Sequence, residues 1–151
     1  MNHNDWVRRE LKPLSQSLGF RYPPREEIEN RLTRIKTWMK RDELEALLVV
    51  QKMNFYYLSG TTQDGLLFLP LEGKPLLMIR RELERARLES PLEGVMAIHS
   101  FRDLPSLIQN HYGNLPETLG LEMDMVPVRD YFKFQGLFQK TRILDATAAF
   151  R

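Results

Sequence analysis

Cysteine is absent from this 151-residue chain, and its absence excludes several kinds of site at once. Without thiols the protein can form no disulfide, offer no thiolate nucleophile and bind no metal through sulfur. A chain that uses no disulfide suits a reducing compartment, so we expect a cytoplasmic protein. With 42% hydrophobic and 28% charged residues, the chain can still bury one core of ordinary size.

Long apolar runs are also missing. A membrane-spanning helix needs roughly 18 or more consecutive apolar residues. Charges or prolines interrupt every apolar stretch of this chain, including the one that begins at Leu66. The amino end carries Asp5, Arg8 and Arg9 with no apolar core after them, which does not fit a signal peptide. We therefore predict no association with a membrane.

The chain also lacks a large excess of charge of one sign. The 22 basic residues face 20 acidic ones, so the net charge is only +2 despite a pI near 9.0, and such a balance predicts no strong field. Glutamates accompany the most basic segment, and no aromatic RNA-binding signature follows it. We interpret this segment as a solvated helix face and predict no nucleic-acid partner. Its basic residues are Arg31, Arg34, Lys36, Lys40 and Arg41.

Recognisable catalytic motifs are not found. The histidines His3, His99 and His111 do not lie at metal-ligand spacing, which favours structural or surface roles for them. The serines lack a G-x-S-x-G elbow, and the eight glycines form neither G-x-G-x-x-G nor a phosphate-binding loop. Acyl transfer and nucleotide binding are therefore not supported.

Glu122 and Asp124 are the best candidates for a metal site. They follow an expected strand, at a position where carboxylates of α/β enzymes can bind metal. No histidine or third carboxylate lies nearby in the sequence, so we favour a solvated strand end. We predict no metal and no cofactor in this chain.

Residues 1–24 are expected to form an amino-terminal extension. Apolar residues recur there every three or four positions and could line an amphipathic helix, broken or kinked at Pro13. These residues are Val7, Leu11, Leu14 and Leu18. After Pro23 and Pro24 a helix is predicted over 25–42, with Ile28, Leu32 and Ile35 on one face.

Residues 25–151 are expected to form one α/β domain with a mixed sheet of about six strands flanked by helices. The unbroken apolar run 46–50 predicts a central strand covered on both faces. Further strands are predicted at 66–69, 76–79, 95–98, 118–122 and 142–144, the first two as a hairpin. Helices are predicted at 81–89, 103–111 and from Pro127 to Phe138. We expect the sheet core to contain Leu47, Val49, Leu67, Leu77, Ile98, Leu119 and Leu121.

Local capping residues complete this prediction. Asn54 is expected to cap a short helix that runs to Leu58, and Gly60 to end it in the left-handed conformation. Asp145 can cap another helix, yet the sequence stops at Arg151 as that helix begins. We therefore expect that the sequence is cut at this point and is not finished.

Two segments carry a resemblance to a known family. Residues 45–50 read E-A-L-L-V-V and residues 54–60 read N-F-Y-Y-L-S-G. They resemble the D-A-L-L-V and N-x-x-Y-L-S/T-G signature of the amino-terminal domain of the creatinase, prolidase and aminopeptidase P family, with Glu45 where aspartate is usual. The hairpin and residues 119–122 (L-G-L-E) are also placed as in that domain. The likeness covers about residues 27–151 and implies a ribonuclease-H-like fold.

The resemblance implies a role without catalysis in this chain. In that family a carboxyl-terminal "pita-bread" domain supplies two aspartates, a histidine and two glutamates to two divalent metal ions, and no residue here matches them. The chain would then be the amino-terminal domain of a metal-dependent Xaa-Pro dipeptidase, aminopeptidase or creatinase-like hydrolase. Its partners would be its own catalytic domain and a second copy in a homo-oligomer, where it would help dimerisation and active-site closure.

The resemblance also suggests a substrate-facing loop in the full-length dimer, formed by Thr61, Thr62, Gln63 and Asp64. From the residues alone, this loop is polar with no apolar side chain to anchor it inward, so we expect it at the surface. An ordinary loop that enters the hairpin is the alternative. For the whole chain, the alternative is a self-standing binding or interaction module with no peptidase partner.

Overall fold

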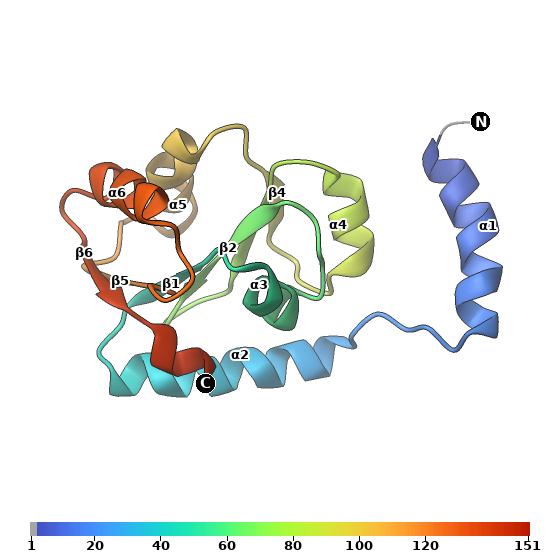
Figure 1. Ribbon diagram of the computed structural model, residues 1–151, viewed down its shortest axis with the longest axis horizontal. Helices are drawn as coiled ribbons and strands as arrows, with labels where there is room; N and C mark the ends of the chain where they lie inside the picture. Colours follow the sequence, from blue (N-terminus) through green and yellow to red (C-terminus); the bar gives the residue numbers. More distant parts are fainter. Residues whose placement is uncertain (1–2) are drawn as a thin grey trace.

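The computed structural model describes residues 3–151 and shows a mixed sheet between two layers of helices (Figure 1). The strands are β1 (Ala46–Val49), β2 (Gly65–Pro70), β3 (Leu76–Ile79), β4 (Val95–Ala97), β5 (Thr118–Leu121) and β6 (Arg142–Asp145). The helices are α1 (His3–Ser17), α2 (Arg25–Arg41), α3 (Lys52–Ser59), α4 (Leu83–Glu89), α5 (Leu104–Tyr112) and α6 (Val128–Leu137), with 3-10 turns η1 (Phe101–Asp103) and η2 (Thr147–Phe150).

The six strands lie in the order β4-β3-β2-β1-β5-β6. Strand β2 pairs antiparallel with β1 and with β3, whereas the β1–β5, β5–β6 and β3–β4 pairs are parallel. Every strand except β2 therefore runs in the same direction. The predicted α/β class, mixed six-stranded sheet and hairpin are confirmed. The hairpin lies inside the sheet, because β4 pairs with the outer side of β3.

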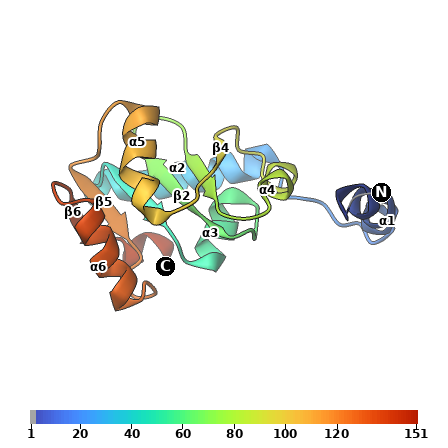
Figure 2. The same ribbon diagram turned by 90° about the horizontal axis from the view of Figure 1, so that it is seen from above.

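The sheet is buried on both faces, as the apolar run in β1 predicts. Leu47 and Val49 contact the core formed with α2, α3 and α4, whereas Leu48 contacts the core formed with α5 and α6. Figure 2 shows α5 and α6 over the same side of the sheet. All predicted core residues are buried, and they divide between the two faces. Leu47, Val49, Leu67 and Leu77 belong to the α2 side, and Ile98, Leu119 and Leu121 belong to the α5 side.

Gly120 lets β5 approach its neighbours on the α2 side. A Cβ atom added at this position would lie 2.4 Å from Leu47 Cδ2 and 2.8 Å from the Cβ of Ala146. A larger residue would force the Leu47 side chain to move and would push Ala146 away from β5. The close packing of these three segments therefore depends on glycine at this position.

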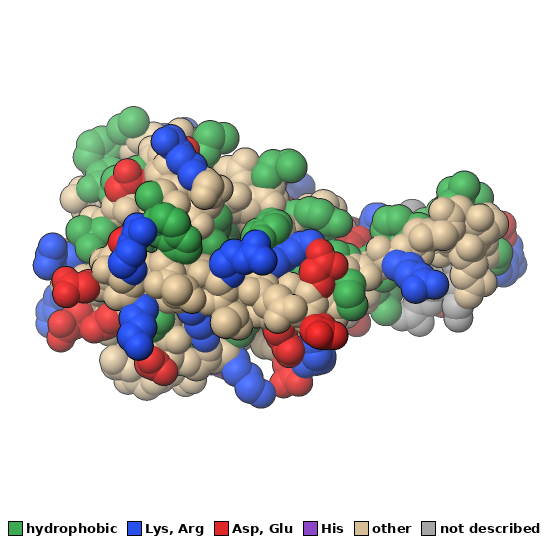
Figure 3. All heavy atoms as spheres, turned by 90° about the horizontal axis from the view of Figure 1, so that it is seen from below, with side chains coloured by type: hydrophobic (Ala, Val, Ile, Leu, Met, Phe, Trp, Pro, Cys, Tyr) green, Lys and Arg blue, Asp and Glu red, His purple; other side chains and the backbone are tan. Residues whose placement is uncertain are grey.

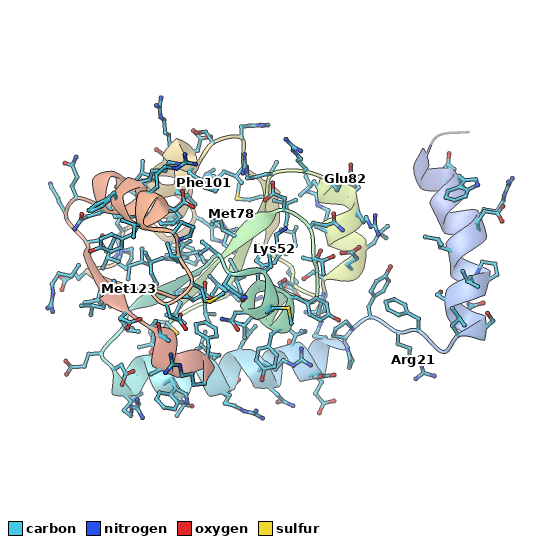
Figure 4. The ribbon with its side chains drawn as sticks, in the orientation of Figure 1. Arg21, Lys52, Met78, Glu82, Phe101 and Met123 are labelled. Carbon is cyan, nitrogen blue, oxygen red and sulfur yellow. The ribbon has the colours of Figure 1, made fainter. Side chains whose placement is uncertain are left out.

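The amino-terminal extension forms a helix that stands apart from the sheet and its helices (Figure 1). Helix α1 continues through Pro13 to Ser17, so Pro13 does not break the helix. The alternative, a kink at Pro13, stays a prediction. Apolar side chains of this extension are exposed, among them Trp6, Leu14 and Phe20. Figure 4 labels Arg21 in the segment that joins α1 to α2. Within residues 3–151, no helix combines the length and apolar character needed to cross a bilayer.

Several element ends differ from the prediction. The helix expected from Arg81 begins at Leu83, because Glu82 before it adopts a left-handed conformation with φ 60°. The helix expected after Asp145 is the 3-10 turn η2. Gln51 caps α3 with its side-chain oxygen, which accepts from the backbone N–H of Asn54 at 2.8 Å, so the predicted cap at Asn54 is wrong. Gly60 ends α3 with φ 78°, as predicted.

We expect the central strands to be sensitive to truncation. Leu48→Ala or Leu121→Ala should lower the free energy of unfolding by about 2–5 kcal/mol, because both side chains are fully buried. Denaturant melts measure this loss. Leu88→Ala is the matched control, since Leu88 is 55% exposed and should change stability by no more than about 0.5 kcal/mol. A loss below about 1 kcal/mol at Leu48 would contradict the packing of β1.

Candidate functional site

The carboxyl ends of five strands, all except β2, meet at one edge of the sheet, and β2 begins there. We call this edge the carboxyl edge. In open α/β sheets this edge is where ligands usually bind. The register places Asp64 beside the end of β3, because the backbone N–H of Arg80 donates to the Asp64 carbonyl at 2.8 Å. Glu122 follows β5 at the same edge, next to the end of β1. The predicted loop and the predicted carboxylate pair therefore share one edge.

The loop 61–64 is only partly exposed. Thr62 and Asp64 are exposed, Gln63 is half-buried and Thr61 is fully buried. The expectation that nothing anchors this loop inward is therefore wrong for Thr61. Asp64 lies 3.7 Å from the guanidinium of Arg80, which ties the far end of the loop to β3.

A buried carboxylate, Glu89 at the end of α4, holds the loop. The Thr61 hydroxyl donates to Glu89 Oε2 at 2.6 Å, and the Gln63 amide donates to Oε1 at 3.0 Å. Arg85 Nε donates to Oε1 at 2.9 Å. Burial alone would raise the pKa of Glu89, but the hydrogen bonds from Thr61, Gln63 and Arg85 outweigh it and lower that pKa.

Glu89 was missed by the sequence prediction. Its only local signal is Arg85 one helical turn earlier, and such i,i+4 pairs are common on solvated helices. The hydrogen bonds to Glu89 determine which side chains of the loop remain exposed. Thr61 and Gln63 are committed to Glu89, so only Thr62 and Asp64 present exposed side chains from this loop.

Glu122 is a buried structural acceptor. Only 1% of the residue is exposed, which overturns the prediction of a solvated strand end at this position. Glu122 Oε2 accepts from the backbone N–H groups of Val50 and Gln51 at 2.9 Å each, and Oε1 accepts from the Asn54 amide at 2.8 Å. Burial raises the pKa of Glu122, and these three donors offset only part of that rise.

Asp124 belongs to a different contact. Its Oδ1 lies 3.0 Å from the Thr147 hydroxyl, and its Oδ2 lies 3.7 Å from the Arg151 guanidinium. Glu122 and Asp124 therefore do not converge on a common point. Among residues 3–151, no three His, Asp or Glu side chains are grouped to hold a metal ion. Figure 4 labels Lys52, at the start of α3, and Met123, which follows β5.

The other candidate residues lie at the surface or in the core. His99 and His111 are exposed, and His111 packs edge-on against Tyr112; the side chain of His3 lies outside the described part. Of the three adjacent rings in α3, Phe55 is buried, Tyr56 is 39% exposed, and Tyr57 lies under the Arg31 guanidinium at 4.5 Å.

The α2 face carries both signs of charge. Figure 3 shows Lys and Arg interspersed with Asp and Glu on this side of the molecule. Arg31 pairs with Glu27 and donates to the Tyr57 carbonyl, and Lys36 donates to the Gly73 carbonyl at 2.7 Å. This arrangement agrees with a solvated helix face, while the absence of a nucleic-acid partner stays a prediction.

Comparison with known proteins shows which families and structures this chain resembles. Residues 31–151 match the family model described as the Creatinase/Prolidase N-terminal domain. Comparison with curated protein sequences gave no match. The structure resembles the N-terminal domain of the cytoplasmic peptidase PepQ from Mycobacterium tuberculosis, with a TM-score of 0.69 and 23% identity over 80% of this chain and 95% of that one.

Two longer relatives share the fold. Prolidase from Pyrococcus furiosus has a TM-score of 0.66 and 20% identity over 79% of this chain, and Xaa-Pro dipeptidase from Bacillus anthracis has 0.71 and 11% over 82%. The matched region spans 36% of the prolidase chain and 34% of the dipeptidase chain. The common architecture therefore makes up about a third of each of these two proteins.

The lowered pKa of Glu89 predicts a pH-dependent contribution to stability. The contribution is present above the unfolded value of about 4.5 and is lost as the pH falls through the lower folded value. Glu89→Gln should therefore be less stable than wild type at pH 7, by about 1–3 kcal/mol. The difference should shrink towards pH 3. Urea melts at several pH values measure it.

Glu84→Gln is the control on the same helix, because its side chain is 67% exposed and pairs with Arg87. This variant should match wild type closely at each pH. A Glu89→Gln deficit that stays constant from pH 7 to the acid range would show that the Glu89 charge does not hold the loop.

Proposed function

This chain belongs to the Creatinase/Prolidase N-terminal domain family, and we propose that it is the non-catalytic amino-terminal domain of an Xaa-Pro peptidase or a creatinase-like hydrolase. The match over residues 31–151 carries this proposal. The prolidase and the Xaa-Pro dipeptidase with the same fold support it, because in both the shared region is only about a third of the chain.

The chemistry is assigned to a domain that follows. The two divalent metal ions implied by the family need a cluster of carboxylates and a histidine, and the described residues offer no such group. The buried carboxylates of this chain already accept hydrogen bonds from other groups of the protein. Glu89 accepts from Thr61, Gln63 and Arg85, and Glu122 accepts from the junction of β1 and α3. The chain's own part is to position a loop and to offer surfaces.

Exposed apolar side chains support docking at the carboxyl edge. Met53 on α3 is 71% exposed and Met125 after β5 is 56% exposed, and Val128 and Phe132 on α6 are exposed as well. Apolar surface of this kind marks interaction sites when it is grouped. Arg151, which contacts Asp124, also lies at this edge. We assign the edge to contacts with the catalytic domain and with a second copy of the chain, which would help dimerisation and active-site closure.

The loop 61–64 is proposed to face the active site of the full-length dimer. Its place at the carboxyl edge and the exposure of Thr62 and Asp64 support this role. The loop holds no arginine, so a clamp for a substrate carboxylate would come from elsewhere. We also infer a cytoplasmic location, which the absence of cysteine supports and which agrees with the name of the PepQ peptidase.

Peptidase kinetics test this proposal. Residues 1–151 should hydrolyse no Xaa-Pro dipeptide in the presence of divalent metal, whereas the chain extended through the coding sequence after Arg151 should do so. In the extended chain, Thr62→Ala and Asp64→Ala should each lower kcat/KM, by roughly tenfold where a hydrogen bond to substrate is lost, because these are the two exposed side chains of the loop. Thr37→Ala on α2 is the control, because its hydroxyl only bonds the Thr33 carbonyl.

The two parts of the proposal fail separately. An extended chain that is inactive on Xaa-Pro substrates would overturn the function. An active extended chain in which both loop variants keep kcat and KM within about twofold, with unchanged stability, would show that the loop is only a connection.

A further inference from the structure

A hollow of about 790 Å³ opens at the carboxyl ends of β3 and β4, apart from the networks of Glu89 and Glu122. Four cationic side chains line it, and they come from three elements. Arg80 follows β3, Arg102 belongs to η1, and Arg129 and Lys133 lie one turn apart on α6. Phe101 also lines the hollow, and Figure 4 shows it beside the start of α5.

The hollow concentrates positive charge in a nearly neutral chain. The residues that line it include four cations and one carboxylate, Asp130, so the lining carries a net charge of +3 while the whole chain carries +2. Asp130 is itself paired with Lys133 at 3.3 Å. Like charges held this close repel one another, and Arg129 and Lys133 have the i,i+4 spacing that destabilises a helix when both are positive.

Two of the three guanidinium groups in this hollow, those of Arg102 and Arg129, form no ion pair with the described residues, whereas Arg80 does. Arg25, Arg31, Arg85 and Arg87 each form an ion pair with a glutamate. Within residues 3–151, by contrast, no carboxylate lies within ion-pair distance of Arg102 or Arg129. Arg80 shares Asp64 at 3.7 Å and lies over the Phe101 ring at 5.1 Å. The guanidinium groups of Arg102 and Arg129 are therefore free to bind an external anion.

The chemistry of the lining selects the class of ligand. Guanidinium forks match the oxygens of phosphoryl groups, which accept two parallel hydrogen bonds from each arginine. The volume lies within the range of roughly 300–1,000 Å³ that is typical of small-molecule sites. Phe101 and Leu137 add apolar lining that suits an organic moiety beside the charge. We propose that this hollow binds a small molecule that carries two or more phosphoryl groups.

Calorimetric titration with inorganic pyrophosphate tests the proposal on residues 1–151, with sodium chloride holding the ionic strength constant. Wild type should bind one pyrophosphate per chain. Arg102→Ala and Arg129→Ala should each weaken binding by roughly tenfold, the expected effect of losing a charged hydrogen-bond donor. Arg142→Ala is the matched control, because Arg142 is an exposed arginine at the start of β6, at the opposite edge of the sheet. It should bind like wild type.

Three results would overturn the proposal. The first is a wild-type titration without saturable binding, and the second is equal weakening by Arg142→Ala, which would show nonspecific attraction to positive charge. The third is tighter binding of a hexaglutamate peptide than of pyrophosphate in the same titration, which would make the hollow a docking surface for an acidic polypeptide.

Discussion

The buried carboxylate of Glu122 is the constraint on which the carboxyl edge of the sheet depends. A buried charge is tolerated only when hydrogen bonds replace its water, and Glu122 takes these bonds from Val50, Gln51 and Asn54. The contact joins β5 to the turn between β1 and α3. Because α3 leads through Gly60 into Thr61, the same contact helps to set where the loop 61–64 begins. Glu89 on α4 then holds the loop through its hydrogen bonds with Thr61 and Gln63.

These two carboxylates respond to pH in opposite directions. Hydrogen bonds lower the pKa of Glu89, so its contribution is lost in acid. Burial raises the pKa of Glu122, so its contribution is fully present in acid and is lost as the pH rises through the folded value. Both acids act as acceptors within the protein.

The sequence pattern correctly predicted those structural features that depend only on residues close together in the sequence. The run of apolar residues at 46–50 is sufficient for a strand buried on both faces, and Gly60 is sufficient for a left-handed helix end, because both follow from local conformation and burial. Asn54 is different. Its side chain bonds Glu122, which is 68 positions away, and Gln51 therefore caps the helix. Thr61 and Glu89 likewise meet only when α4 folds back over the loop. No local pattern encodes such long-range partners.

We propose that the acids of the carboxyl edge act as structural acceptors and bind no metal ion. Elemental analysis after incubation with Mn²⁺ or Zn²⁺ and dialysis, together with denaturant melts, tests it for wild type and for Glu122→Ala. The account predicts no stoichiometric metal in wild type and a loss of at least about 2 kcal/mol in the variant, because three buried donors lose their acceptor. One metal ion per wild-type chain that disappears in the variant, with stability changed by less than about 0.5 kcal/mol, would contradict it.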